Sequence, residues 1–259
     1  MELLAMLLKK SQEQLKNDLY DHLKYLEMDP LYEDGFIYAK GKIPVLLVAH
    51  MDTVFPIKPK KIYYNKAQDI IFNPEPNNGL GGDDRCGVYA ILKLLKKYRP
   101  YVLFTEDEEI GCVGAIKATK KLSIPDIKYI IEFDRRGEND CVFYDCGNET
   151  FMNYVESFGF KTARGSYSDI VELSNAWDVA SVNLSCGYYH EHTPNEYVVF
   201  SQLEQTIKKA DLMLSKIKEA PRFEYQKICY DFDFDIPTYN LWYKKLFLEK
   251  KDGNNNDRN

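Results

Sequence analysis

Short, nearly continuous apolar runs alternate along the chain with segments whose apolar residues recur every three or four positions. The run at 44–54, PVLLVAHMDTV, predicts a buried strand, and 88–98, VYAILKLLKKY, predicts a helix. This alternation continues to a long closing helix predicted at 196–220. It is typical of an α/β fold with a largely parallel sheet covered by helices on both faces.

The remaining elements complete the pattern. A leading helix is predicted within 3–28, and a short edge hairpin at 35–42. Further strands are predicted at 101–105, 127–134 and 179–189, and further helices at 115–122 and 149–160. We therefore expect one domain over 1–220 and an extension over 221–259, with an appended strand and short helix at 230–251 and disorder at 252–259.

Composition limits the classes of partner. With 259 residues, 45% of them hydrophobic, the chain can bury one large core. A net charge of −6 without a basic stripe argues against nucleic acid. No apolar run reaches the roughly 20 residues of a membrane helix, and the apolar start has its acid before its lysines, the reverse of a signal peptide. We expect a cytoplasmic protein, with its six cysteines as reduced thiols; none forms a CxxC pair.

Acids and histidines collect where the apolar strands end. Each has an ordinary explanation, since EDEE at 106–109 reads as a solvated turn, DD at 83–84 as a helix cap and a lone histidine as a structural residue. Their shared position is what counts, because the carboxyl ends of parallel strands form the ligand crevice of an open sheet. These polar residues are His50 and Asp52, the acids 106–109, Asp134, His190 and His192.

The residue types suit a pair of divalent metal ions. Imidazole and carboxylate oxygen are good ligands for zinc, and cobalt or manganese can substitute. Two ions about 3.5–4 Å apart need one bridging carboxylate and further ligands for each ion. Glu108 is then left beside a ligand, free to act on water. The candidate ligands are His50, Asp83, Glu109, Asp134 and His192.

Five segments in this order resemble the co-catalytic di-zinc exopeptidases, over roughly residues 30 to 215. They are AHMDTV, GLGGDDRCG, TEDEEIG, EFD and HTPNE. The clan includes peptidase T, the acetylornithine deacetylase and carboxypeptidase G relatives, and the leucyl and glutamyl aminopeptidases. The resemblance implies their three-layer, phosphorylase/hydrolase-like core. Both intervals where relatives insert a dimerisation or lid domain are short here, so a lid-free catalytic domain is expected.

The resemblance also implies the roles of the residues. His50, Asp83 and Asp134 would hold one zinc, and Asp83, Glu109 and His192 the other, with Asp83 bridging. Glu108 would be the general base, and Asp52 would fix the ring of His50. The peptide bond between Asp83 and Asp84 is expected to be cis, although base rates overwhelmingly favour trans.

Substrate residues are less defined. Arg135 and Arg136, in DRRGEND, are read either as ligands for a substrate carboxylate, with Arg135 as the candidate, or as arginines facing solvent. Asp169, in GSYSDI, resembles a segment near the family's pocket, and His190 is expected to lie behind the metal ligands or in solvent.

The leading functional hypothesis is a metal-dependent hydrolase that cleaves a small peptide as an aminopeptidase or a di- or tripeptidase. An N-acyl amino acid deacylase and a single-zinc cyclase are alternatives on the same core. A metal-free binding or scaffold protein is the alternative of another class, and the complete ligand set argues against it.

Overall fold

The computed structural model describes residues 1–123 and 126–228. Residues Met1–Lys227 form one compact unit. Its helices are α1 (Glu2–Leu8), α2 (Gln12–Tyr25), α3 (Gly82–Leu95), α4 (Val113–Lys121), α5 (Glu149–Glu156), α6 (Asp169–Trp177) and α7 (Phe200–Ser215). Its strands are β1 (Leu31–Glu33), β2 (Phe36–Ala39), β3 (Ile43–His50), β4 (Tyr63–Asn65), β5 (Ile70–Phe72), β6 (Pro100–Thr105), β7 (Tyr129–Arg135), β8 (Asp140–Val142), β9 (Lys161–Thr162), β10 (Ser181–Ser185), β11 (Tyr188–Tyr189) and β12 (Tyr197–Val199).

The main sheet has eight strands in the described residues, in the order β1-β2-β6-β3-β7-β10-β8-β9. Its four central strands, β6, β3, β7 and β10, run parallel, while β2 joins β6 and β8 joins β10 in antiparallel orientation. The fold class predicted from the alternating pattern is thus confirmed. The continuous apolar runs follow from position, because a central parallel strand is covered on both faces.

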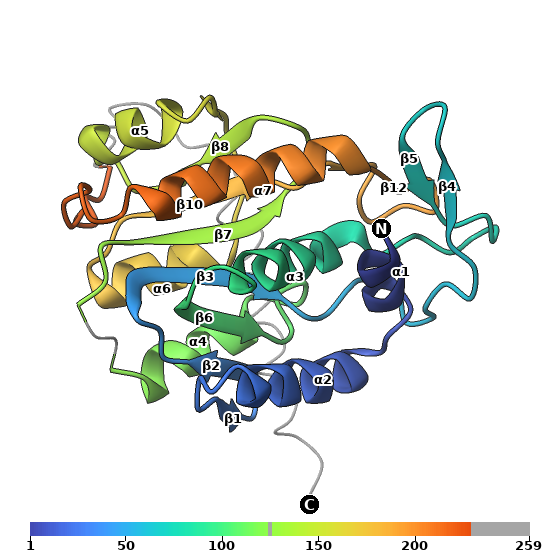
Figure 1. Cartoon of the computed structure of the whole chain (residues 1–259), viewed down its shortest axis with the longest axis horizontal. Helices are drawn as coiled ribbons and strands as arrows, with labels where there is room; N and C mark the ends of the chain where they lie inside the picture. Colours follow the sequence, from blue (N-terminus) through green and yellow to red (C-terminus); the bar gives the residue numbers. More distant parts are fainter. Residues whose placement is uncertain (124–125, 229–259) are drawn as a thin grey trace, which may run out of the picture. The chain divides into compact units, whose positions relative to one another are not determined.

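Helices cover both faces of this sheet (Figure 1). Helices α3 and α7 pack on one face and α4 and α6 on the other. The apolar side chains accordingly divide into two clusters: a large one that includes α1, α2, α3, α5 and α7, and a smaller one that includes α4 and α6. The sheet therefore forms the middle layer of three.

Local polar interactions changed several predicted boundaries. The prediction of one leading helix is wrong, because the segment forms two helices, α1 and α2. A new helix begins after Ser11, which caps α2 in a capping box with Gln14. The closing helix begins only at Phe200, since residues 197–199 pair with β5 and β11 instead. The strand predicted at 179–189 is interrupted at Gly187, whose φ of +74° turns the chain into β11.

Other elements lie at a shifted position or were not predicted. The edge hairpin lies at 31–39, as β1 and β2, rather than at 35–42. A separate four-stranded sheet, β11-β12-β5-β4, and helix α6 were not predicted. Two-residue and three-residue strands contain too few positions for a period of two to stand out.

The predicted boundary after residue 220 stays a prediction. Residues 221–227 lie in the compact unit, where the Phe223 ring is buried and its amide donates to the Lys128 carbonyl at 2.8 Å. The expected strand and helix at 230–251 and the disorder at 252–259 lie outside the described residues. None of the described helices is long and apolar enough to span a bilayer.

Candidate metal centre

The candidate ligands converge at the carboxyl ends of the central strands. His50 is the last residue of β3, Glu109 lies in the loop after β6, and Asp134 lies at the end of β7. Asp83 comes from the start of α3 and His192 from the turn between β11 and β12. The structure therefore brings together residues that are up to 142 positions apart, as the crevice argument predicted.

Asp83 lies between the two histidines. Its Oδ1 is 3.0 Å from Nε2 of His50, and its Oδ2 is 3.1 Å from Nε2 of His192. On one side, Oδ1 of Asp134 is 3.5 Å from the same His50 nitrogen. On the other side, Oε2 of Glu109 is 3.0 Å from the His192 nitrogen. One oxygen of Asp83 thus faces each half of the cluster, which is the placement that a bridging carboxylate requires.

These donors fit divalent metal ions. Three groups offer donor atoms that all lie within 4.8 Å of one another in the described residues. Two of them share Asp83, namely His50, Asp83 and Asp134 in one and Asp83, Glu109 and His192 in the other; the third is His50, Glu108 and Glu109. Ligands at about 2.0–2.1 Å from a tetrahedral zinc lie roughly 3.3 Å apart, and the separations above are close to that value. Each half supplies imidazole and carboxylate only, the donors that zinc, cobalt and manganese share.

The peptide bond between Asp83 and Asp84 is cis, as predicted. Asp84 turns away from the cluster, and its carboxylate accepts from the amide of Gly87 at 2.7 Å and from the amide of His50 at 3.2 Å. Two consecutive aspartates therefore have separate tasks. Asp83 faces the histidines, while Asp84 ties the first turn of α3 to the end of β3.

Asp52 holds three groups of the site at once. Its Oδ1 lies 3.2 Å from Nδ1 of His50, which leaves Nε2 of that ring pointing at Asp83. Its two oxygens also accept from the amides of Glu108 and Glu109, each at 3.1 Å. The sequence predicted the contact with the histidine but not the contacts with the acidic loop. Asp52 therefore connects the end of β3 to the loop after β6.

The carboxylates of the cluster raise the pKa of both histidines. Burial alone would lower the pKa of His50, yet Asp52 and Asp134 raise it well above its ordinary value. Hydrogen bonds with Asp83 and Glu109 raise the pKa of His192 to about 11. In the metal-free chain the two imidazoles thus take up the protons that offset the carboxylates.

Glu108 precedes Glu109 in this loop and offers a carboxylate oxygen within 4.8 Å of a ring nitrogen of His50. Burial, with the charges of Asp134 and Asp169 adding to it, raises the pKa of Glu108 to about 9, against an opposing effect of His50. Its side chain also accepts from the Cys112 thiol, with 3.6 Å between Sγ and Oε1. A cation in the cluster favours the ionised form and so acts against this shift.

Two residues of the site escaped the sequence reasoning. The carboxylate of Glu196 accepts from the backbone amides of Gly81 and Asp83, at 2.6 and 3.0 Å. The hydroxyl of Tyr188 donates to Oδ1 of Asp134 at 3.1 Å. Glu196 ends the quoted segment HTPNE, so the signal was present in the sequence, whereas Tyr188 read as an ordinary strand residue.

A polar cleft of about 120 Å³ opens beside the ligands. Arg135 lines it with a side chain that is 19% exposed, and Arg136 lines it with one that is 57% exposed. Arg136 pairs with Glu191 at 2.8 Å. Arg136 thus faces solvent, while Arg135 is mostly enclosed.

The other two residues considered for substrate lie elsewhere. Asp169 is fully buried at the start of α6 and accepts from the Thr105 hydroxyl. His190 is exposed, with its ring 5.7 Å from that of Tyr197. Neither belongs to the described residues that line the cleft.

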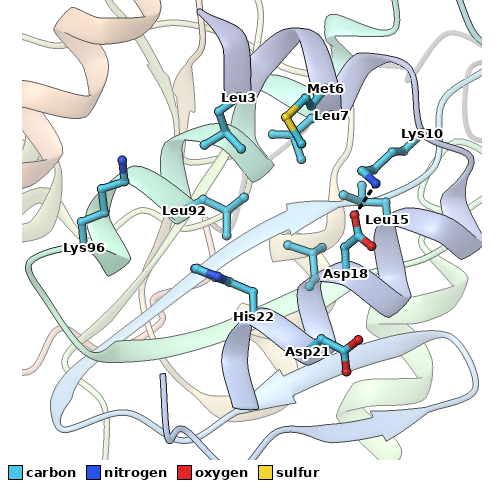
Figure 2. Close-up of a pocket in the computed structure, with 11 residues that line it drawn as sticks. Leu3, Met6, Leu7, Lys10, Leu15, Asp18, Asp21, His22, Leu92 and Lys96 are labelled. Carbon is cyan, nitrogen blue, oxygen red and sulfur yellow. Dashed lines mark ion pairs between the residues drawn. The ribbon is translucent and has the colours of Figure 1, made fainter. Parts of the chain in front are cut away.

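A larger hollow, of about 340 Å³, lies between α1, α2 and α3 (Figure 2). Its floor is apolar, with Leu3, Leu7 and Leu92 among its residues, and the ion pair of Lys10 with Asp18 lies at its edge. Its histidine, His22, belongs to none of the potential metal-binding groups of the described residues. The candidate metal ligands therefore lie at the smaller cleft and not at this larger hollow.

Comparison with known proteins identifies the fold. No known protein-family profile matches the chain, and no curated protein does so either. Among solved structures, the chain is similar to the aminopeptidase PepT of Bacillus cereus, with 14% identity and a TM-score of 0.68 over 84% of this chain and 97% of that one. A tripeptidase of Staphylococcus aureus gives 14% and 0.66 over 84% and 97%. The TET1 peptidase of Pyrococcus horikoshii gives 14% and 0.63 over 82% and 98%. The chain therefore has the fold of these peptidases.

Proposed function

We propose that this protein is a metal-dependent exopeptidase that hydrolyses short peptides, as an aminopeptidase or a di- or tripeptidase. The observation that carries the proposal is Asp83, which presents one oxygen to His50 and the other to His192. The peptidase fold and the two three-residue donor groups that share Asp83 support it. The proposed metals are two zinc ions, with cobalt or manganese as substitutes.

The proposed ligands divide into a shared residue and two pairs. His50 and Asp134 complete one half, and Glu109 and His192 complete the other, with Asp83 common to both. When bound, the ions would polarise the scissile carbonyl and lower the pKa of the attacking water. Asp52 keeps the proton of the His50 ring on Nδ1, so that Nε2 remains free to ligate.

Glu108 is the proposed general base. It takes a proton from the attacking water as the new carbon–oxygen bond forms. It then returns that proton to the leaving amine as the carbon–nitrogen bond breaks, so that an acid and an amine are released. Asp52 accepts from the amides of both Glu108 and Glu109 and so holds this loop. The proposed base and the proposed ligand are therefore consecutive residues.

Arg135 is proposed to bind a carboxylate of the substrate. Its guanidinium donates to the Arg164 carbonyl at 3.1 Å, and its closest acid, Asp140, is 3.8 Å away. Its Nε has no partner in the described part of the chain. A mostly enclosed guanidinium with one short protein contact has donors left for a planar carboxylate.

The same arginine supports a second candidate function. N-acyl amino acids and dipeptides both carry a free carboxylate one residue beyond the bond to be cut. A deacylase would use the same metal ligands and the same base, but its substrate would not need a free amino terminus. We therefore keep N-acyl amino acid deacylase as the alternative.

One substrate screen with metal analysis tests these proposals. The zinc-loaded protein is assayed on free dipeptides, amide-capped dipeptides, aminoacyl chromophores and N-acetyl amino acids. We expect two equivalents of bound metal and hydrolysis of free dipeptides above the capped ones. Cleavage of N-acetyl amino acids alone would favour the deacylase. Two bound metals without turnover of any of these substrates would contradict both.

The preference for a carboxylate is tested by Arg135→Gln, with Arg136→Gln as the matched control. Both variants lose one positive charge from the cleft, but Arg136 already has Glu191 as partner. We expect Arg135→Gln to raise KM for free dipeptides and to leave capped dipeptides unaffected. If the unaltered protein has equal KM values for free and capped dipeptides, the carboxylate-binding role of Arg135 is contradicted. The proposed peptidase activity is not affected by that result.

The expected setting and partners remain part of the proposal. The cysteines Cys86, Cys112, Cys141, Cys146 and Cys186 are all free thiols, which supports a reducing, cytoplasmic compartment. The partner proposed is a small peptide or an N-acyl amino acid, neither a nucleic acid nor a membrane.

A further inference from the structure

The hairpin of β11 and β12 contacts the candidate metal centre from three positions. His192, at its turn, faces Asp83 and Glu109. Tyr188, on β11, donates to Asp134. Glu196, at the start of β12, reaches the backbone on either side of Gly82. One short segment thus supplies one candidate ligand and contacts three others.

Glu196 is 2% exposed, as is Tyr188. Its two oxygens have separate partners, because Oε2 accepts from the Gly81 amide and Oε1 from the Asp83 amide. No lysine or arginine of the described chain forms an ion pair with it, and its donors are these two backbone amides at the start of α3.

The contact leaves little room for movement of the segment before Asp83. Gly81 has a φ of +75°, which a glycine adopts readily. A Cβ on Gly82 would lie 3.1 Å from Oε1 of Glu196 and 3.0 Å from Cγ2 of Val198. The backbone of residues 81–83 is therefore held against the hairpin, and the direction of the Asp83 side chain is fixed with it.

The distance from Glu196 to His192 is fixed by local hydrogen bonds. The Thr193 hydroxyl donates to the His190 carbonyl at 2.7 Å, and the Glu196 amide donates to the Thr193 carbonyl at 3.1 Å. The strands on either side are in register, with Tyr188 opposite Val198. The same turn therefore positions both the imidazole of His192 and the backbone of Glu196.

We propose that Glu196 is a positioning residue for the metal centre, which sets Asp83 so that one oxygen faces each metal ion. This inference rests on the proposed function, since it assumes that the two donor groups hold metals. Glu196 contacts the backbone of Asp83 and not the reacting atoms. Glu196 therefore affects whether two ions can share the Asp83 carboxylate. It affects turnover only through that sharing.

The test is Glu196→Gln. The amide retains the shape but replaces one oxygen with an NH₂ group, which would face a backbone N–H with no acceptor between them. Asn148→Ala is the matched control, because Asn148 is also a buried polar side chain that accepts from a helix N-terminal amide, on α5. Both variants are expected to lower the melting temperature, so stability cannot be the deciding measurement.

Two measurements decide between positioning and a merely structural contact. Calorimetric titration with zinc gives the affinity of each equivalent. Electron paramagnetic resonance of the Mn²⁺-loaded protein reports the magnetic coupling between two ions that share a carboxylate. We expect Glu196→Gln to weaken one equivalent by about 10–100-fold, the usual effect of losing a residue that orients a ligand. We also expect the coupled signal to give way to that of isolated ions, while Asn148→Ala keeps both affinities within about twofold.

Wild-type affinities and an intact coupled signal in Glu196→Gln would overturn the inference while leaving the proposed function in place. Fewer than two metal equivalents in the unaltered protein would instead overturn the proposed function. If Glu196→Gln does not fold, Glu196→Asp replaces it. That variant keeps the charge but is one methylene too short to reach both amides, and the same two outcomes apply to it.

Discussion

The two halves of the candidate metal centre differ in how the chain supports them. His50 is 0% exposed and is the last residue of a central strand, whereas His192 is 48% exposed and lies on a turn between two short strands. The first half is part of the core, so its geometry is fixed by packing and by Asp52. The second depends on a loop and a small hairpin. A rigid anchor beside an accessible position suits a site that must hold metal and still admit substrate.

The adjacent acids of the loop after β6 give the largest expected effect. Glu108→Gln should lower kcat by about 10²–10⁴-fold, or about 3–5 kcal/mol of barrier, because the amide cannot accept a proton. Metal content should stay unchanged. Glu109→Gln, the neighbouring control, should instead weaken the exposed half. Normal turnover by Glu108→Gln, measured at saturating zinc, would show that the base is another residue.

Removing each histidine compares the two halves directly. We expect His50→Ala to abolish metal binding in the buried half, since no water can easily take the place of a fully enclosed imidazole. His192→Ala should weaken the exposed half by about 100-fold, because water can occupy the vacated position.

Calorimetric titration with zinc measures both histidine variants, and His190→Ala is the control for a neighbouring histidine. Because His190 faces solvent, the zinc affinities of His190→Ala should stay within about twofold of those of the unaltered protein. A greater loss at position 190 than at position 192 would exchange their roles.

Asp52→Asn tests how the rigid half is oriented, with a smaller effect. The asparagine can still accept one hydrogen bond, but it no longer holds three groups with a charged side chain. We expect about tenfold weaker metal binding. An unchanged affinity, measured in the same titration, would mean that packing alone orients the His50 ring.

A pH dependence of stability should distinguish the metal-free from the metal-loaded protein. Burial raises the pKa of Glu108 from 4.5 to about 9, and hydrogen bonds raise the pKa of His192 from 6.5 to about 11. Between pH 4.5 and 9 the folded state therefore binds more protons than the unfolded state, so the stability of the metal-free protein falls as pH rises.

Melting temperatures across that range measure this difference. Saturating zinc should flatten the curve, because cations replace the protons that the cluster would otherwise bind. A metal-free protein whose melting temperature rises from pH 5 to pH 9 would contradict the assignment.

Sequence alone determined the parts of this protein that depend on local pattern and chemical type. The apolar run that ends in His50 identified a central strand, because burial on both faces requires continuous apolar residues. The polar residues at the strand ends identified the edge of the sheet where the candidate ligands meet. The resemblance of GGDDRCG to the exopeptidases correctly predicted the cis bond at Asp83.

Tertiary structure decided whatever depends on contacts between distant segments. Glu196 and the amides it accepts from are more than 110 positions apart, so no local pattern could connect them. The neighbours Arg135 and Arg136 have the same side chain and differ only in what surrounds them: one is enclosed in the cleft and the other pairs with Glu191 in solvent. The sequence specifies the chemical type of each side chain, but its burial and its contact partners are determined only when the chain folds.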